Sequence, residues 1–292
     1  MIKKLLFVYL LLMFNQHLFG QITSQNKREI LNLDGKWEVV IDWYNNANHT
    51  IVSDKKATGT TEFLEFSFDN SQTLQVPGDW NSQKPELKFY EGTVWYKRNF
   101  SYVKRGNTRL LLKFGAVNYA CEIYLNGKSV GSHEGGFTSF EFDVTQAIKD
   151  GENLLIVRVN NQRKEDNIPA LKFDWWNYGG ITRSVALQEV PSHYISDYFI
   201  QLEKSSLSRV SAWVKLNEQR REKVHLEIPE AGISKSVLSD SNGYASFIFP
   251  ARLALWSPSK PKLYKINIST ANDLVEDEVG FRSIEVKNGE IL

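Results

Sequence analysis

Short runs of apolar or alternating residues, each closed by turn-forming residues, dominate the chain after residue 20 and leave almost no helical periodicity. Such runs predict β-strands, because successive side chains of a strand face opposite sides of a sheet. The pair Asn126-Gly127 follows one run and predicts a tight hairpin turn. The pattern therefore predicts an all-β fold. Up to residue 190 the predicted strands are residues 37–43, 94–102, 109–114, 120–125, a strand that resumes at 129–130 after the hairpin turn, 139–144, 153–160 and 182–190, with one helical turn at 145–149.

A new set of strands begins after Pro191, which predicts a domain boundary there. Eight or more strands over the preceding part, about 160 residues, favour a jelly-roll sandwich. Short strands over the next part, about 95 residues, favour an immunoglobulin-like sandwich. The predicted domains are residues 27–190 and 191–287, and residues 288–292 are expected to begin a further, missing domain. The strands predicted in the second domain are residues 194–203, 209–216, 223–228, 244–249, 263–270 and 277–286.

The first twenty residues have the layout of a secretory signal peptide. Lys3 and Lys4 precede the apolar run at residues 5–14, and Gly20 offers a small residue at the cleavage point. The run is too short to cross a bilayer, which takes about 20 residues. A buried N-terminal helix is the alternative. The sequence therefore predicts an exported protein, periplasmic if the source is Gram-negative.

Charge and cysteine usage narrow the possible partners. The 35 basic and 34 acidic residues balance, which argues against binding to nucleic acid or to an anionic membrane surface. The only cysteine, Cys121, lies in an apolar run and is expected to be a buried small hydrophobe. His133 and Glu134 are neighbours, but a single histidine with a single carboxylate is not a metal-ligand set. No metal and no cofactor is predicted.

Residues 174–181 form the stretch most suited to contact a ligand. Trp175 and Trp176 can cover the apolar face of a sugar, while Asp174 and Asn177 can hydrogen-bond its hydroxyl groups. Two glycines near the end of the stretch permit tight or positive-φ backbone. These four side chains are predicted to bind substrate. In the alternative, the tryptophans fill the sandwich core or a domain interface.

Many segments together resemble glycoside hydrolase family 2, the family of β-galactosidases and β-glucuronidases. The resemblance covers nearly all of residues 30–292, and the order of the segments makes it specific. The matching segments are residues 33–37 (LDGKW), 76–80 (VPGDW), 92–98 (GTVWYKR), 115–117 (GAV), 124–127 (YLNG), 130–131 (VG), 133–137 (HEGGF), 142–145 (FDVT), 174–183 (DWWNYGGITR), 256–258 (WSP), 261–264 (PKLY) and 279–282 (VGFR).

The resemblance implies a modular enzyme that cleaves β-linked terminal sugars with retention of configuration. In such enzymes a sugar-binding jelly roll and an immunoglobulin-like domain precede a (β/α)₈ barrel, which carries two catalytic glutamates. The aspartate matching Asp174 reaches the active site of that barrel and touches the sugar.

A barrel needs about 250 residues, and none are left here. The glutamates therefore have no counterpart, and no catalytic residue is predicted. The chain is therefore expected to be the N-terminal portion of a retaining β-glycosidase. This portion is expected to bind a β-linked sugar and to be inactive by itself. A stand-alone carbohydrate-binding protein is one alternative. Another is a non-catalytic scaffold that associates with a barrel on another chain, and self-association is also open.

Overall fold

The computed structural model describes residues 28–47, 51–54, 66–168, 170–172, 174–284, 286–287 and 289–291. The predicted signal peptide lies outside the described residues. Two compact units appear, one of residues Arg28–Ser192 and one beginning at His193. Both are antiparallel sandwiches, which confirms the all-β prediction. In the described part the helical elements are short, and no (β/α) barrel is present; they are α2 (Trp80–Gln83), η2 (Ile51–Ser53), η3 (Pro85–Leu87) and η4 (Pro229–Ala231).

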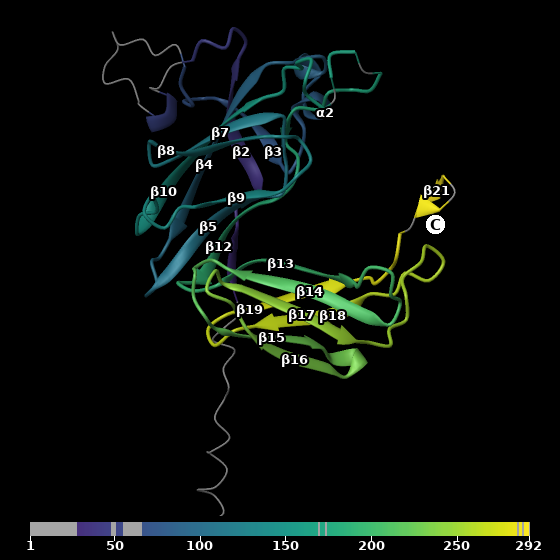
Figure 1. Cartoon of the computed structure of the whole chain (residues 1–292). Coiled ribbons are helices and arrows are strands. Elements are labelled where there is room, and N and C mark those ends of the chain that lie inside the picture. Colours follow the sequence, from purple (N-terminus) through teal and green to yellow (C-terminus); the bar gives the residue numbers. More distant parts are fainter. Residues whose placement is uncertain are drawn as a thin grey trace, which may run out of the picture. The chain divides into compact units, whose positions relative to one another are not determined.

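The first unit packs a four-stranded sheet against a six-stranded sheet (Figure 1). The smaller sheet has the order β1 (Glu29–Asn32), β12 (Val185–Pro191), β5 (Thr108–Phe114) and β9 (Phe140–Asp143). The larger sheet has the order β3 (Gln72–Val76), β2 (Gly35–Asp42), β4 (Thr93–Tyr102), β10 (Gly151–Asn160), β7 (Ala120–Leu125) and β8 (Lys128–Glu134). Two short strands, β6 (Val117–Asn118) and β11 (Gly180–Ile181), form a separate two-stranded antiparallel sheet.

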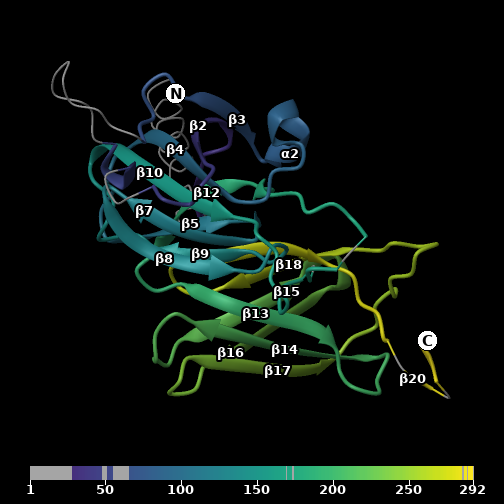
Figure 2. The same cartoon turned by 90° about the horizontal axis from the view of Figure 1, so that it is seen from above.

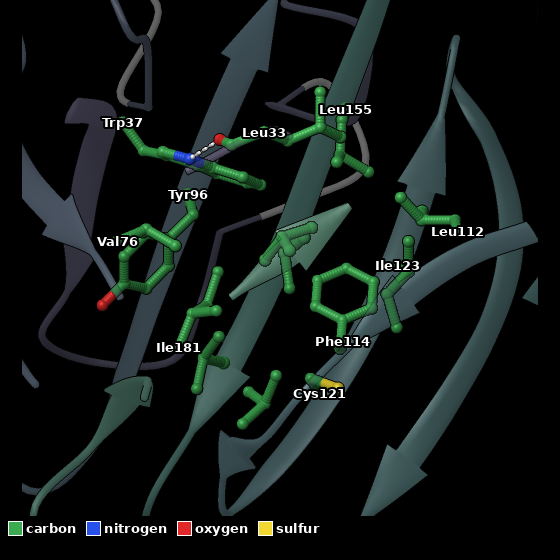
Figure 3. Packing of buried hydrophobic residues seen from close by; sticks show 14 of the residues in the cluster. Leu33, Trp37, Val76, Tyr96, Leu112, Phe114, Cys121, Ile123, Leu155 and Ile181 are labelled. Atoms are coloured by element: carbon green, nitrogen blue, oxygen red, sulfur yellow. Dashed lines mark hydrogen bonds between the residues drawn. The ribbon is translucent and has the colours of Figure 1, made fainter. Parts of the chain in front are cut away.

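The core of this unit fills the space between the two sheets (Figure 3). Trp37 is fully buried, and its indole Nε1 donates to the carbonyl oxygen of Leu33 at 2.9 Å, so the ring brings no unpaired donor into the core. Cys121 is buried in the same cluster, as predicted. Burial raises the pKa of its thiol to about 12. This cysteine is therefore a packing residue with little thiolate at neutral pH.

The six-stranded sheet is covered on its other face as well. Trp95 and Ile156 point to that side and pack against Ile51, Val52 and Phe68 from the segment that joins β2 to β3. Burial on both faces explains why β10 carries a continuous apolar run at residues 154–157, and why residues 93–97 of β4 are all buried rather than alternately buried and exposed.

The hairpin predicted at Asn126-Gly127 is present between β7 and β8. Both residues have positive φ, 53° and 79°, as a two-residue hairpin of this kind requires. Leu125 pairs with Lys128 directly across the turn. The helical turn predicted at 145–149 is a single turn, closed by the amide of Ile148 donating to the carbonyl of Val144 at 3.0 Å.

The second unit packs a three-stranded sheet against a four-stranded sheet (Figure 2). Seven strands in this arrangement match an immunoglobulin-like sandwich. The sheets have the orders β13 (Ile195–Leu202), β14 (Arg209–Leu216), β17 (Tyr244–Pro250) and β16 (Ile233–Leu238), β15 (Lys223–Ile228), β18 (Tyr264–Ser269), β19 (Leu274–Val279).

Two predicted features of this unit differ from the structure. The strand predicted at residues 277–286 is β19, which runs from Leu274 to Val279 and therefore begins and ends earlier. It is an edge strand with no buried side chain, so its alternation is weak in the sequence. β16 was absent from the prediction for the same reason. Near residues 288–292 the chain forms a small hairpin of β20 (Val286–Lys287) and β21 (Glu290–Ile291).

Candidate substrate-binding site

The predicted ligand stretch lies in the loop that leaves β10 at Asn161 and returns to regular structure at β11. Its side chains divide into two groups. The outer group is exposed and consists of Asp174, Trp175, Trp176 and Tyr178. The inner group is buried and consists of Asn177, Gly179, Gly180 and Ile181.

Asparagines from β6 and from the position directly after β10 hold the inner group. Asn177 is 5% exposed, and its Nδ2 donates to the carbonyl oxygen of Asn161 at 2.5 Å. Asn161 Nδ2 donates back to the carbonyl of Asn177 at 3.1 Å. Asn118 Nδ2 donates to Asn177 Oδ1 at 3.2 Å and also to the carbonyl of Tyr178. The amide side chains thus supply the hydrogen bonds that an irregular buried backbone cannot make to a sheet.

A second anchor comes from the segment around α2. Asn81 Oδ1 accepts from the amide of Gly179 at 2.9 Å, while Asn81 Nδ2 donates to the carbonyl of Leu87 at 2.9 Å. The amide of Trp80 donates to the carbonyl of Gly179 at 2.9 Å. Asp79 caps α2 by accepting from the amide of Ser82 at 2.7 Å. The loop is therefore fixed from two sides.

Both glycines of the inner group are required by space or conformation. A methyl group on Gly179 would lie 2.1 Å from Cζ2 of the buried Trp80 ring. Gly180 has φ +141°, and a methyl group there would lie 2.7 Å from the carbonyl oxygen of Gly78. The tight and positive-φ backbone predicted for this pair is confirmed.

The outer group presents aromatic rings to solvent. Trp176 is 39% exposed and Trp175 is 58% exposed. The Trp176 ring lies 5.1 Å from the ring of Phe89 and 6.5 Å from that of Tyr178, measured between centroids. Its Nε1 donates to the carbonyl of Lys88 at 3.1 Å, which fixes the orientation of the indole. The alternative that the two tryptophans fill the sandwich core is therefore wrong.

A pocket of about 250 Å³ lies where the outer group meets the segment after α2. It brings together all four predicted residues, Asp174, Trp175, Trp176 and Asn177, with the side chains of Asn81, Phe89, Glu91 and Arg163. Arg163 and Glu91 form a two-point ion pair, with distances of 2.5 Å from Nη2 to Oε1 and 3.2 Å from Nε to Oε2. Polar groups beside exposed rings are the usual composition of a small-molecule site.

Asp174 has no hydrogen bond or ion pair with any residue that the structure describes, and its side chain is exposed. Its carboxylate is available to accept hydrogen bonds from a ligand. Asn177 differs, because both ends of its amide are already bonded within the protein. Sugar contact by these four residues stays a prediction, and for Asn177 the structure adds a role in holding the loop.

Sequence reasoning missed the pocket residues outside the stretch, Asn81, Phe89, Glu91 and Arg163. Phe89 follows a short turn-rich segment, and an aromatic residue in such a segment is the sequence signal that could have pointed to it. The structure shows this side chain 76% exposed. Glu91 and Arg163 gave no such signal in the sequence, because their ion pair joins positions 72 residues apart.

His133 stacks on Phe140 with centroids 4.0 Å apart, and its Nε2 lies 3.2 Å from the carbonyl oxygen of Gly135. In the described part of the chain, no group of three or more histidine, cysteine or acidic side chains could hold a metal ion. No helix here has the length and apolar character to cross a membrane.

Two family profiles match the chain, one after the other. The profile described as glycosyl hydrolases family 2, sugar binding domain, matches residues 30–191. The profile described as glycosyl hydrolases family 2 matches residues 193–282. The chain belongs to glycosyl hydrolase family 2. The resemblance predicted from the sequence segments is thereby confirmed.

Relatives within family 2 are β-glucuronidases and β-galactosidases. The chain is 31% identical over 237 residues to a Formosa agariphila protein with a provisional β-glucuronidase name, covering 75% of this chain and 29% of that protein. It is 26% identical over 286 residues to a β-galactosidase of Thermoanaerobacter pseudethanolicus, covering 89% of this chain and 36% of the relative. The chain thus spans about a third of the length of these curated relatives.

A solved structure of this family has the same fold. The β-glucuronidase of Bifidobacterium dentium, complexed with coumarin-3-O-glucuronide, superposes with a TM-score of 0.79 at 24% identity. The match covers 94% of this chain and 51% of that one. This family 2 chain therefore corresponds to the N-terminal portion of β-glucuronidase- and β-galactosidase-like enzymes, and the match does not cover their catalytic domain.

Proposed function

We propose that this chain is the sugar-facing, non-catalytic front portion of a retaining β-glycosidase whose substrates end in a β-linked glucuronic acid or galactose. The order of the two family 2 domains supports this, as do the names of the relatives. The observation that carries the proposal is the Asp174 carboxylate. It stands unpaired among the described residues, at the wall of a pocket whose aromatic side is already fixed.

Asp174 would accept hydrogen bonds from the hydroxyl groups of the terminal sugar. A carboxylate acceptor makes stronger hydrogen bonds than a neutral one, so the interaction can discriminate hydroxyl orientation. Asp174→Asn keeps the shape and removes the charge. Titration calorimetry with methyl β-D-glucuronide and methyl β-D-galactoside should show binding to the wild-type chain and at least about tenfold weaker binding to the variant, as expected for a lost charge-assisted bond. Equal affinities would contradict the proposal.

Hydrolysis itself would need residues beyond the two matched domains. Retaining hydrolysis uses two carboxyl groups about 5–5.5 Å apart, with different pKa values, on either side of the scissile bond. We propose a (β/α)₈ barrel as the domain partner that supplies them. The chain alone should therefore release no 4-nitrophenol from the β-glucuronide or the β-galactoside. Turnover that copurifies with the chain and survives a second purification step would overturn this part.

A stand-alone carbohydrate-binding protein is the second candidate. It is favoured by one observation, that the whole pocket belongs to the unit Arg28–Ser192. The two candidates differ in what completes the site. Binding of a glycoside that is as tight for the chain alone as for the chain mixed with a family 2 barrel would favour the stand-alone reading. Binding that tightens on mixing would favour the enzyme portion.

We also propose that the protein is exported. The support is the charged start and short apolar run within residues 1–20. N-terminal sequencing of the protein recovered outside the cytoplasm should find a start at or near Gln21. Recovery of intact protein from the cytoplasmic fraction alone would contradict export.

A further inference from the structure

Three exposed aromatic side chains form a continuous shelf, Phe89, Trp176 and Tyr178, and the first two of them line the pocket. Phe89 is 76% exposed and Tyr178 is 51% exposed. A large contiguous patch of exposed apolar surface is uncommon on a folded protein and marks contact sites. Nothing about the backbone of the loop requires these rings to be large, because the inner group is already held by Asn118, Asn161 and the α2 segment.

The shelf is rigid where it borders the pocket. The indole of Trp176 is fixed through its bond to the Lys88 carbonyl, and Phe89 packs against it at an interplanar angle of 40°. Lys88 Nζ lies 5.5 Å from the Phe89 centroid on the same segment. Rings held before a ligand arrives lose little conformational entropy on binding, so even a small contact area contributes to affinity.

The size and composition of the pocket select one kind of occupant. A volume of about 250 Å³ accommodates one or two ring-sized groups. Asp174 and the Arg163–Glu91 pair supply the polar side, and Phe89 with Trp176 supplies the apolar side. A molecule with a hydroxyl-rich ring joined to a flat apolar ring satisfies both sides at once.

We propose that Phe89 and Trp176 form a subsite for the group attached to the anomeric oxygen of the glycoside, and that this group is a flat aryl ring. The inference rests on the proposed function, because it takes Asp174 as the contact to the terminal sugar. Asp174, Phe89 and Trp176 line the same pocket, so a glycoside of two rings can reach both the carboxylate and the two aromatic rings. The shelf then acts as a specificity determinant that separates aryl glycosides from alkyl glycosides.

The test compares two ligands on the full chain. Phenyl β-D-glucuronide and methyl β-D-glucuronide share the sugar and differ in the ring, and the same pair of galactosides serves as a second set. Dissociation constants come from tryptophan fluorescence and saturation-transfer NMR, with ligand up to about 10 mM, a range that captures weak sites. Phe89→Ala is the main variant, since an exposed side chain can be truncated without unfolding the domain. Phe137→Ala is the matched control, because Phe137 is also exposed, at 61%, but does not line the pocket.

Phe89→Ala should weaken the phenyl glycoside about threefold to tenfold, the range expected for one aromatic pair, and leave the methyl glycoside within about twofold. Phe137→Ala should change neither. Saturation transfer to the phenyl protons should fall in Phe89→Ala and in Trp176→Ala.

The possible failures are distinguishable. If Asp174→Asn weakens both glycosides while Phe89→Ala weakens neither, or weakens both equally, the aryl subsite is wrong and the sugar contact stands. If Phe89→Ala weakens only the phenyl glycoside while Asp174→Asn has no effect, the subsite stands and the proposed role of Asp174 falls. A wild-type chain that binds the phenyl glycoside no better than the methyl glycoside overturns the subsite outright. Stronger binding of a disaccharide than of the phenyl glycoside would show that the shelf takes a pyranose ring and would overturn the aryl assignment.

Discussion

The outer and inner groups of the 174–181 stretch are interleaved in sequence but face opposite environments. Trp175 is 58% exposed, whereas Asn177, two residues on, is 5% exposed. The inner group makes its hydrogen bonds to Asn118, Asn161 and Asn81 and meets the ring of Trp80. The outer group makes few bonds inside the protein, and Asp174 makes none with the described residues.

This difference separates stability from recognition within a single motif. Leaving a buried polar group without its hydrogen-bond partner costs free energy, so changes to the inner group should lower the stability of the fold. Exposed side chains near no partner cost little when changed, so changes to the outer group should alter binding and leave folding alone. The four variants below test that separation, in order of decreasing effect on stability.

Gly179→Ala should have the largest effect. The added methyl group would overlap the ring of Trp80, which is fully buried and cannot move away cheaply. Overpacking of this severity should lower the free energy of unfolding by about 3 kcal/mol, measured by urea denaturation followed by tryptophan fluorescence. Gly106→Ala is the control: its φ of +21° also disfavours alanine, but a methyl group there meets nothing within 4 Å, so its loss of stability should be the smaller one. Equal losses for the two variants would contradict the clash.

Cys121 gives an independent readout of the same variant. Its thiol is buried in the core of the first unit, and burial raises its pKa to about 12, so it should not react with a thiol reagent in the folded protein at pH 8. Reaction requires opening of the core. Gly179→Ala should speed labelling in proportion to its lost stability, and an unchanged rate would mean that the loop is not coupled to the core.

Asn177→Ala should come second. The substitution leaves the carbonyl oxygen of Asn161 without the donor it has in the wild type, and an orphaned buried polar group costs about 1–3 kcal/mol. Chemical denaturation measures the loss. Asn107→Ala, at an exposed turn, should stay within about 0.5 kcal/mol of the wild type. If the two asparagine variants are equally stable, the network is not holding the loop.

Tyr96→Phe should have a small effect of the opposite sign. The Tyr96 hydroxyl is buried close to Gly180 and has no hydrogen-bond partner among the described residues. Burial, with a further contribution from Asp79, raises its pKa well above the ordinary tyrosine value. Removing an unpaired buried hydroxyl should stabilise the domain by up to about 1 kcal/mol, seen as a higher melting temperature. A clear loss of stability would show that the hydroxyl is bonded in solution.

Asp174→Asn should have the smallest effect on folding and the largest effect on recognition. Its side chain is exposed, so the free energy of unfolding should stay within about 0.5 kcal/mol of the wild type. Sugar affinity should fall, as described for the calorimetric test. A stability loss as large as that of Asn177→Ala would erase the distinction between the two groups.

Strands were predicted best where apolar and polar residues alternate within the strand itself. β7, β14 and β15 have the bounds predicted for them, because in each of them buried side chains alternate with half-buried or exposed ones. Prediction failed at β1, whose residues are all exposed, and at β19, which has no buried residue. Edge strands owe their pairing to a neighbour, so their own sequence contains little of the signal.

The residues alone determined the fold class, the hairpin at Asn126-Gly127, the family and the stretch that lines the pocket. Tertiary structure decided which side of that stretch is buried and which residues complete the pocket. The physical reason is that the partners are main-chain groups and side chains from β6, α2 and the end of β10, up to about a hundred positions away. A buried asparagine amide needs hydrogen-bond partners whatever the fold, but the fold decides which groups lie within reach of it. The residue type of Asp174 was enough to predict it as a ligand contact. The structure added that its carboxylate is exposed, on a loop that hydrogen bonds from other segments fix in place.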